Sequence, residues 1–154
     1  MERTFVMIKP DGVQRRLVGR IVNRVEEKGL KIVGLKLVSM RESQATELYA
    51  VHKGKAFYDG LVMFVTSSPV VVMTIEGAYA VKVVRALLGA TFGHEAAPGT
   101  IRGDFATSKG FNLIHGSDSP ESSAREIPIF FRPEELVSWS PADTTWVYEE
   151  PERK

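Results

Sequence analysis

The hydrophobic positions of this chain fall into short blocks with two different periods. Continuous runs rich in β-branched and aromatic residues, ended by turn-forming residues, are typical of buried strands. Such runs predict strands over residues 4–8, 30–40, 70–75 and 112–115. The first run ends at Lys9-Pro10-Asp11-Gly12, a sequence that predicts a turn.

Between these runs, apolar residues recur at helical spacing. Helices are predicted over residues 17–28, 43–51, 57–65, 83–88 and from 120 onward. Ser43 and Ser119 are the expected N-caps of the second and the last of these, because a serine hydroxyl can accept a hydrogen bond from a first-turn amide. Residues 89–111 show little periodicity and are rich in glycine, so a long functional loop is expected there.

The order of these elements predicts an α+β fold. We expect a ferredoxin-like βαββαβ sandwich, with an antiparallel four-stranded sheet and helices packed on one face. The length of 154 residues and the hydrophobic content of 44% suit a single domain, residues 1–154, with a sizeable core. Residues 136–154 are expected to be a C-terminal extension, whose aromatic side chains should pack on the domain or on a neighbouring subunit.

The composition excludes several classes of function. Twenty Lys and Arg against nineteen Asp and Glu give a formal charge of +1, so neither specific nucleic-acid binding nor membrane binding is expected. The chain has no cysteine and its three histidines are not closely paired, so no protein metal site is expected. Because the chain also has no signal-peptide pattern and no apolar run of roughly 18 residues, we expect a cytoplasmic location.

Residues 112–119 contain the strongest candidate for chemistry. His115 ends an apolar stretch directly before a glycine, so its ring should lie at a strand end within reach of a ligand. A neutral imidazole is a nucleophile without an activating base, provided that one nitrogen is held and the other is free. Glu126, on the helix that follows Ser119, is a candidate to hold the ring nitrogen that does not act as the nucleophile. Taken alone, a histidine is more often solvated or packed in a core, and Ser123 with Glu126 also fits a capping box.

Cationic side chains fall at the ends of predicted elements. Lys9, Arg85 and Arg102 are far apart in sequence but could converge on a phosphate chain, although each alone is more often a solvated charge. Thr91 could add a hydroxyl donor. Phe57 follows a polar run, so its ring is either a partly exposed stacking surface or ordinary core packing.

Three known sequence signatures of nucleotide and RNA binding are missing. The sequence contains no P-loop and no protein-kinase glycine loop, so phosphate handling would need a different scaffold. Lys109-Gly110-Phe111 begins like an RNA-binding motif, but Leu113 and Gly116 stand where stacking aromatic residues belong. We therefore reject the RNA interpretation.

Three blocks of the sequence resemble the nucleoside diphosphate kinase family, and the similarity covers about residues 3–149. The blocks are Lys9-Pro10-Asp11-Gly12-Val13-Gln14-Arg15, Pro98-Gly99-Thr100-Ile101-Arg102-Gly103-Asp104-Phe105 and Asn112-Leu113-Ile114-His115-Gly116-Ser117-Asp118-Ser119. Together, in this order and spacing, they are highly specific. The resemblance implies an enzyme that transfers the γ-phosphate of a nucleoside triphosphate, mainly ATP, to a nucleoside diphosphate by a ping-pong mechanism with broad base specificity.

The resemblance also implies roles for individual residues. It makes His115 the phosphate-accepting nucleophile, held by Glu126, which Ser117 braces, with Tyr49 and Lys9 beside the transferring group. The nucleotide-binding positions that it implies are Lys9, Phe57, Leu61, Arg85, Thr91, Arg102 and Asn112.

The same resemblance implies a cofactor and an assembly. Mg²⁺ is expected to arrive bound to the nucleotide phosphates, with Asp118 at most a helper through water. The tail Trp146-Val147-Tyr148-Glu149 is similar to that of hexameric members, which favours a homohexamer over a tetramer. Thr91 is followed by Phe92-Gly93-His94, where the family more often has a small polar residue and a proline, so the geometry of this loop is not carried over.

A non-catalytic nucleotide-binding module on the same scaffold is the main alternative. Such a module could keep Phe57, Arg85 and Arg102 but would not need His115 or Glu126. Because all five are present, the sequence favours the enzyme. A secondary role as a nucleic-acid or protein partner finds no support in the near-zero net charge.

Overall fold

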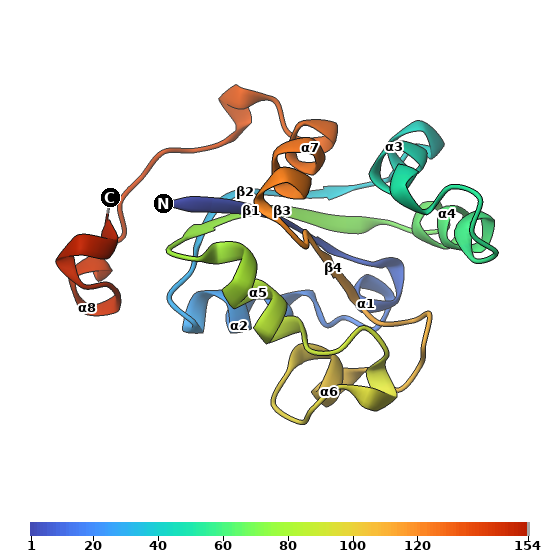
Figure 1. Ribbon diagram of the computed structural model, residues 1–154, viewed down its shortest axis with the longest axis horizontal. Helices are drawn as coiled ribbons and strands as arrows, with labels where there is room; N and C mark the ends of the chain where they lie inside the picture. The colour runs from blue at the N-terminus through green and yellow to red at the C-terminus, as the bar shows by residue number, and fades with distance from the viewer. Residues whose placement is uncertain (154) are drawn as a thin grey trace.

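Four strands form one sheet in the computed structural model of the chain, which describes residues 1–153 (Figure 1). They are β1 (Glu2–Ile8), β2 (Lys31–Val38), β3 (Val70–Gly77) and β4 (Ile114–Gly116). The strand order is β2-β3-β1-β4, and every neighbouring pair is antiparallel. This arrangement confirms the predicted ferredoxin-like α+β fold. Lys154, the last residue of the predicted extension, lies outside the described residues.

The helices differ widely in length. The longer ones are α2 (Val18–Glu27), α3 (Glu42–Leu48), α4 (Tyr58–Thr66), α5 (Ala80–Leu88) and α7 (Pro120–Phe130). Short helices are α1 (Pro10–Gln14), α6 (Ile101–Phe105) and α8 (Thr144–Val147), and the 3-10 turns are η1 (Ala50–His52), η2 (Gly93–Glu95), η3 (Pro133–Glu135) and η4 (Glu150–Arg153). Within residues 1–153, no helix has the length and apolar character that crossing a lipid bilayer requires.

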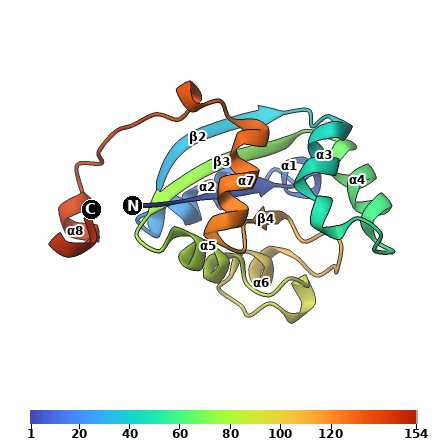
Figure 2. The same cartoon turned by 45° about the horizontal axis from the view of Figure 1, so that its top comes forward.

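The sheet has a hydrophobic core on each of its two faces. Alternate residues of β1 point to opposite sides. Val6 and Ile8 pack in a core with α2 and α5, whereas Phe5 and Met7 pack in a second core with α3, α4 and α7. Figures 1 and 2 show α2 and α5 on one side of the sheet and α3 and α7 on the other. The prediction of helices on one face was therefore wrong, because the central strands are apolar on both faces and bury both.

Two of the predicted helix starts can be compared with the structure. Ser119 is the N-cap of α7, as predicted, and its Oγ accepts from the Ser122 amide at 3.0 Å. Ser123 therefore lies inside the helix, and the capping-box alternative for Ser123 and Glu126 was wrong. Ser43 is not the N-cap of α3, because that helix begins one residue earlier, after Arg41.

Three segments near the later site differ from the predicted pattern, two of them by being more ordered and the third by being shorter. The expected turn at residues 9–12 is the start of α1, with Pro10 at its first position. The expected loop at 89–111 contains η2 and α6, and Thr100 caps α6 by accepting from the Gly103 amide. The expected strand at 112–115 begins only at Ile114.

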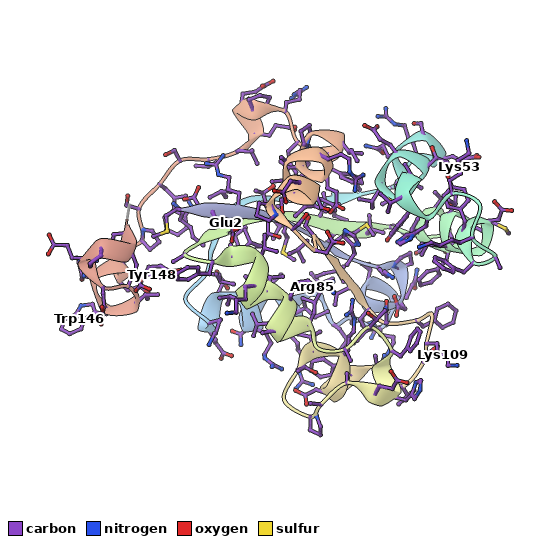
Figure 3. The ribbon with its side chains drawn as sticks, in the orientation of Figure 1. Glu2, Lys53, Arg85, Lys109, Trp146 and Tyr148 are labelled. Carbon is purple, nitrogen blue, oxygen red and sulfur yellow. The ribbon has the colours of Figure 1, made fainter. Side chains whose placement is uncertain are left out.

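The C-terminal tail packs on the domain through two of its aromatic residues. The Trp139 indole donates to the carbonyl of Ile32 at 3.0 Å, and the Tyr148 hydroxyl donates to the carbonyl of Gly29 at 3.2 Å. Trp146 is 90% exposed. Figure 3 shows Tyr148 on the domain side of α8 and Trp146 on its outer side. The N-terminus and α8 lie at the end of the molecule opposite α4 (Figures 1 and 2).

Candidate active site

His115 is held at one of its two ring nitrogens. Its Nε2 lies 2.9 Å from Oε2 of Glu126, and Ser117 Oγ donates to the same carboxylate oxygen at 2.6 Å. Glu126 and Ser117 are buried, while the His115 side chain is 19% exposed. Since a carboxylate only accepts hydrogen bonds, Nε2 carries a proton, and in the neutral imidazole Nδ1 then keeps its lone pair. The site therefore presents an oriented imidazole with one free nitrogen.

This pair is assembled from β4 and α7. His115 is paired with Met7 in the β1–β4 register, so the pairing with β1 fixes the position of His115 in the sheet. The other carboxylate oxygen of Glu126 accepts from Arg125 at 3.2 Å, and Arg125 also donates to the carbonyl of Leu48 at 3.4 Å. These bonds tie α7 to the end of α3. Sequence reasoning missed Arg125, for which adjacency to Glu126 was the available signal.

Tyr49 ends α3 and packs edge-on against His115, with ring centroids 5.7 Å apart and an interplanar angle of 87°. The tyrosine is 4% exposed, and burial raises the pKa of its hydroxyl above the usual range. The hydroxyl therefore remains a donor at neutral pH. It has no hydrogen-bond partner among residues 1–153. A buried unpaired donor is costly in an apo protein, and it suits an oxygen atom of a ligand.

Lys9 and Asn112 form a buried polar pair beside the histidine strand. Lys9 Nζ donates to Oδ1 of Asn112 at 2.8 Å, and Nδ2 of the Asn112 side chain donates to the carbonyl of Thr91 at 2.8 Å. Burial, followed by the positive charge of Arg102, lowers the pKa of Lys9 to about 8. The lysine is thus mostly charged at neutral pH but is poised to lose its proton. Thr91 itself is exposed next to this pair.

Arg102 is buried, and its guanidinium donates hydrogen bonds to backbone carbonyls. It donates to Asn112 at 3.2 Å and to Ile114 at 2.6 Å, and also to Gly89 at 3.1 Å. Burial, followed by the charge of Arg85, lowers the pKa of Arg102 to about 10, so it stays charged at pH 7. Arg85 donates to the carbonyl of Gly116 at 3.4 Å. Lys9 and Arg102 are bonded at the start of β4 and Arg85 at its end, so the structure gathers three cationic side chains from separate parts of the chain around this strand.

A row of rings leads away from His115 toward α4. The His52 ring lies 6.2 Å from Tyr49 and 5.3 Å from Phe57. Phe57 is 53% exposed, so the core-packing alternative for it was wrong. Leu61 lies one helical turn later and is half-buried. Sequence reasoning missed His52, whose only signal was its place in the polar run before Phe57.

Residues 1–153 contain no group of three or more His, Asp or Glu side chains arranged to hold a metal ion. Asp118 is exposed at the turn between β4 and α7 and accepts from Ser122 Oγ at 2.6 Å. This hydrogen bond is the largest cause of a pKa below the usual range for Asp118, which keeps the carboxylate ionised.

The family model for nucleoside diphosphate kinase matches residues 2–136 of this chain. A nucleoside diphosphate kinase of Archaeoglobus fulgidus is 56% identical over 150 residues, which cover 97% of this chain and 99% of the relative. The chain belongs to the nucleoside diphosphate kinase family. Its reaction class is therefore that of the family, the enzymatic transfer of phosphate between nucleotides.

Solved structures of family members share the fold. A halophilic nucleoside diphosphate kinase from Halobacterium salinarum, solved in complex with CDP, superposes with a TM-score of 0.94 at 56% identity, covering 96% of this chain and 99% of that chain. A nucleoside diphosphate kinase family protein from Babesia bovis reaches a TM-score of 0.93 at 45% identity, covering 96% of this chain and 100% of that chain. The sheet with a helical layer on each side is thus the architecture of this nucleoside diphosphate kinase family member.

Proposed function

We propose that this chain moves the γ-phosphate of a nucleoside triphosphate, mainly ATP, to a nucleoside diphosphate through a phosphohistidine at His115. The observation that carries the proposal is the fixed imidazole, with Nε2 held by Glu126 and Nδ1 free. Nδ1 attacks the terminal phosphorus, the bond to the bridging oxygen breaks, and the diphosphate leaves with that oxygen. A terminal oxygen of the second diphosphate then attacks the same phosphorus, and the N–P bond breaks to restore His115.

The cationic side chains stabilise the transferring group. In this proposal Lys9, Arg85 and Arg102 supply positive charge near the phosphates, Tyr49 offers its unpaired hydroxyl, and Thr91 adds a second hydroxyl. Removal of one such donor typically costs about 10²- to 10³-fold in rate. Mg²⁺ bound to the nucleotide phosphates would add positive charge there, and Asp118 would at most contact it through water. Lys9 and Asn112 bind the ribose hydroxyls in this proposal.

The base stacks on Phe57, with Leu61 beside it. Every nucleobase has a π-face, so stacking contributes roughly 1–3 kcal/mol whichever base is bound. The half-exposed ring of Phe57 supports this role, and the relative from Halobacterium salinarum, solved with CDP, supports a nucleotide as the ligand. Broad base specificity follows from the absence of any need for base-specific hydrogen bonds.

We further propose that the chain works as a homohexamer. An indole as exposed as that of Trp146 supports an assembly in which a neighbouring subunit covers it. Sedimentation equilibrium would distinguish a hexamer from the tetrameric alternative. The single domain over residues 1–154, the extension over 136–154 and the cytoplasmic location stay predictions of the sequence.

The phosphohistidine is tested by labelling with γ-labelled ATP. The wild-type chain should take up label that is lost in acid and stable in base, with a matching gain in intact mass, and it should convert GDP to GTP. His115→Ala should do neither. Label retained by the variant would refute His115 as the nucleophile, while nucleotide binding by the wild type without any labelling would favour the non-catalytic module.

A further inference from the structure

The chain enters β4 through a backbone conformation that L-amino acids rarely adopt. Leu113 has a φ of 70°, in the left-handed region. The Ile114 amide donates to the carbonyl of Asn112 at 2.8 Å, which closes a γ-turn with Leu113 at its centre. Such turns are strained and persist only where the surroundings hold them. Because His115 is the second residue after Leu113, this turn sets the direction in which the nucleophile leaves the loop.

The γ-turn is held through the backbone of Leu113. The Leu113 amide donates to Oδ2 of Asp11 at 3.0 Å, and the Leu113 carbonyl accepts from the Lys9 amide at 2.8 Å. Leu113 is 0% exposed, so water is not available to replace these partners. Arg102 grips the two flanking carbonyls, those of Asn112 and Ile114, from another side. The carboxylate of Asp11 is the side-chain group that accepts the hydrogen bond of the Leu113 amide, at the centre of the turn.

Asp11 is kept in this position at a cost. Its second oxygen, Oδ1, is buried and has no hydrogen-bond partner among residues 1–153. A buried carboxylate oxygen without a hydrogen-bond partner destabilises a fold, and such unsatisfied groups concentrate at functional sites. The close approach also needs Gly12, because a Cβ there would lie 3.2 Å from the Leu113 carbonyl oxygen and 2.6 Å from Cγ2 of Ile8. The start of α1 is thus built to bring the carboxylate against the turn.

We infer that Asp11 is a positioning residue for phosphohistidine formation. Its carboxylate holds the Leu113 amide, keeps the γ-turn in place and thereby aims His115 and the neighbouring Asn112. This inference rests on the proposed function and adds a residue that acts through the backbone of β4. An alternative role through charge is weaker, because Asp11 is only the third cause acting on the pKa of Lys9, after burial and Arg102.

Two substitutions separate the hydrogen bond from the charge. Asp11→Ala removes the acceptor and should slow the single-turnover rate of phosphohistidine formation about 100-fold, as expected when a catalytic group is displaced by about 1 Å. Asp11→Asn loses the charge but keeps an oxygen acceptor, so its rate should stay within about tenfold of the wild type. Binding of ADP, measured by calorimetry, should change far less than the rate in both variants. Asp143→Ala, at an exposed aspartate without a side-chain cap bond, is the matched control.

Two results would contradict the positioning role of Asp11. A folded Asp11→Ala variant with the wild-type rate overturns it, and equal losses in Asp11→Ala and Asp11→Asn assign the effect to charge instead. If Asp11→Ala does not fold, Asp11→Ser, whose hydroxyl is too short to reach the same amide, takes its place in the comparison. Crystal structures of the folded variants add a readout that does not depend on activity. In Asp11→Ala or Asp11→Ser, Leu113 should leave the left-handed region. In Asp11→Asn, Leu113 should keep its positive φ.

These structures also separate the inference from the proposed function. If the wild-type chain forms no phosphohistidine, the proposed function fails, whereas the conformation of Leu113 in the variants still tests whether Asp11 holds the turn. If phosphohistidine forms normally and Leu113 is unmoved by Asp11→Ala, the inference fails alone.

Discussion

The two ends of the candidate site are built in opposite ways. At the end that contains His115, buried side chains are tied to one another or to backbone carbonyls, as Glu126 and Arg102 show. At the end that contains Phe57, the rings lie 5.3 and 6.2 Å apart, Lys55 Nζ lies 3.1 Å from Nδ1 of His52, and the outermost ring is 53% exposed and, being a hydrocarbon, has no side-chain hydrogen bond of its own. Hydrogen bonds fix direction, while stacked rings fix only a plane.

This difference matches the two tasks in the proposed reaction. Phosphoryl transfer needs an in-line approach, so errors of about 1 Å at the nucleophile are expensive. A base that is accepted whatever its identity needs a surface without directional demands. Substitutions at the His115 end should therefore change the rate of the chemical step, and substitutions at the Phe57 end should change binding.

Replacing the carboxylate that holds His115 should have the largest effect. Glu126→Gln keeps the shape but offers the imidazole an amide that can donate as well as accept, so the ring can adopt the wrong tautomer or turn. A comparable change in a serine protease triad lowers kcat about 10⁴-fold, and we expect about 10³- to 10⁴-fold here. Rapid-quench measurement of phosphohistidine formation would check this.

The control for this substitution lies on the same helix. Glu121→Gln changes an exposed glutamate in the first turn of α7 and should leave the rate near that of the wild type. Equal rates for Glu126→Gln and Glu121→Gln would remove the distinction between the two ends of the site, since the buried network would then contribute nothing to the chemistry.

How far this network could be predicted depends on the range of its contacts. Ser119 marks the start of α7, and the helical repeat then places Glu126 without any knowledge of the rest of the chain. By contrast, the bond from Leu113 to Asp11 joins residues 102 positions apart, and no local pattern announces it. Leu113 is apolar and sits in an apolar run, so the sequence predicted a strand where the tertiary contacts impose a γ-turn.

The fold shows the same limit. The periods of the apolar residues predicted the strands and the main helices, because these are local properties. They did not predict that α3, α4 and α7 would cover the second face of the sheet, since the strand pattern alone does not say which helices pack where. His52 was missed for a different reason. Its ring partners Tyr49 and Phe57 lie only three and five residues away, but a single histidine in a polar run has no pattern that marks it as part of a site.

Lys9 gives a second, smaller effect with a signature in pH. With its pKa lowered to about 8, Lys9 loses its charge as pH rises through that value, so kcat/KM should fall above about pH 8. Stability should change in the opposite sense. Between about 8 and the ordinary value of 10.5, the unfolded chain binds more protons than the folded chain, so this group makes unfolding less favourable as pH rises.

Because kcat/KM should fall above about pH 8 while this group makes the fold more stable, a fall in kcat/KM can be assigned to the lost charge of Lys9 and not to unfolding. Lys9→Met should lower kcat/KM at pH 7 by about 10²- to 10³-fold and abolish the alkaline fall that belongs to Lys9. Lys53→Met, at an exposed lysine after η1, is the control and should keep both the rate and the profile. An alkaline fall that persists unchanged in Lys9→Met would assign it to another group and contradict the low pKa of Lys9.

The smallest effect is expected at the base end and should appear in binding alone. Phe57→Ala removes the stacking surface, worth roughly 1–3 kcal/mol, or about 5- to 150-fold in the dissociation constant. The loss should be similar for adenine, guanine and cytosine diphosphates, and single-turnover rates at saturating nucleotide should hardly change. Calorimetric titration of ADP, GDP and CDP into both proteins measures this, with Met63→Ala, an exposed apolar residue on α4, as the control. If one nucleotide lost far more affinity than the others, Phe57 would be part of a base-specific contact. The end of the site that contains Phe57 would then need directional hydrogen bonds to the base.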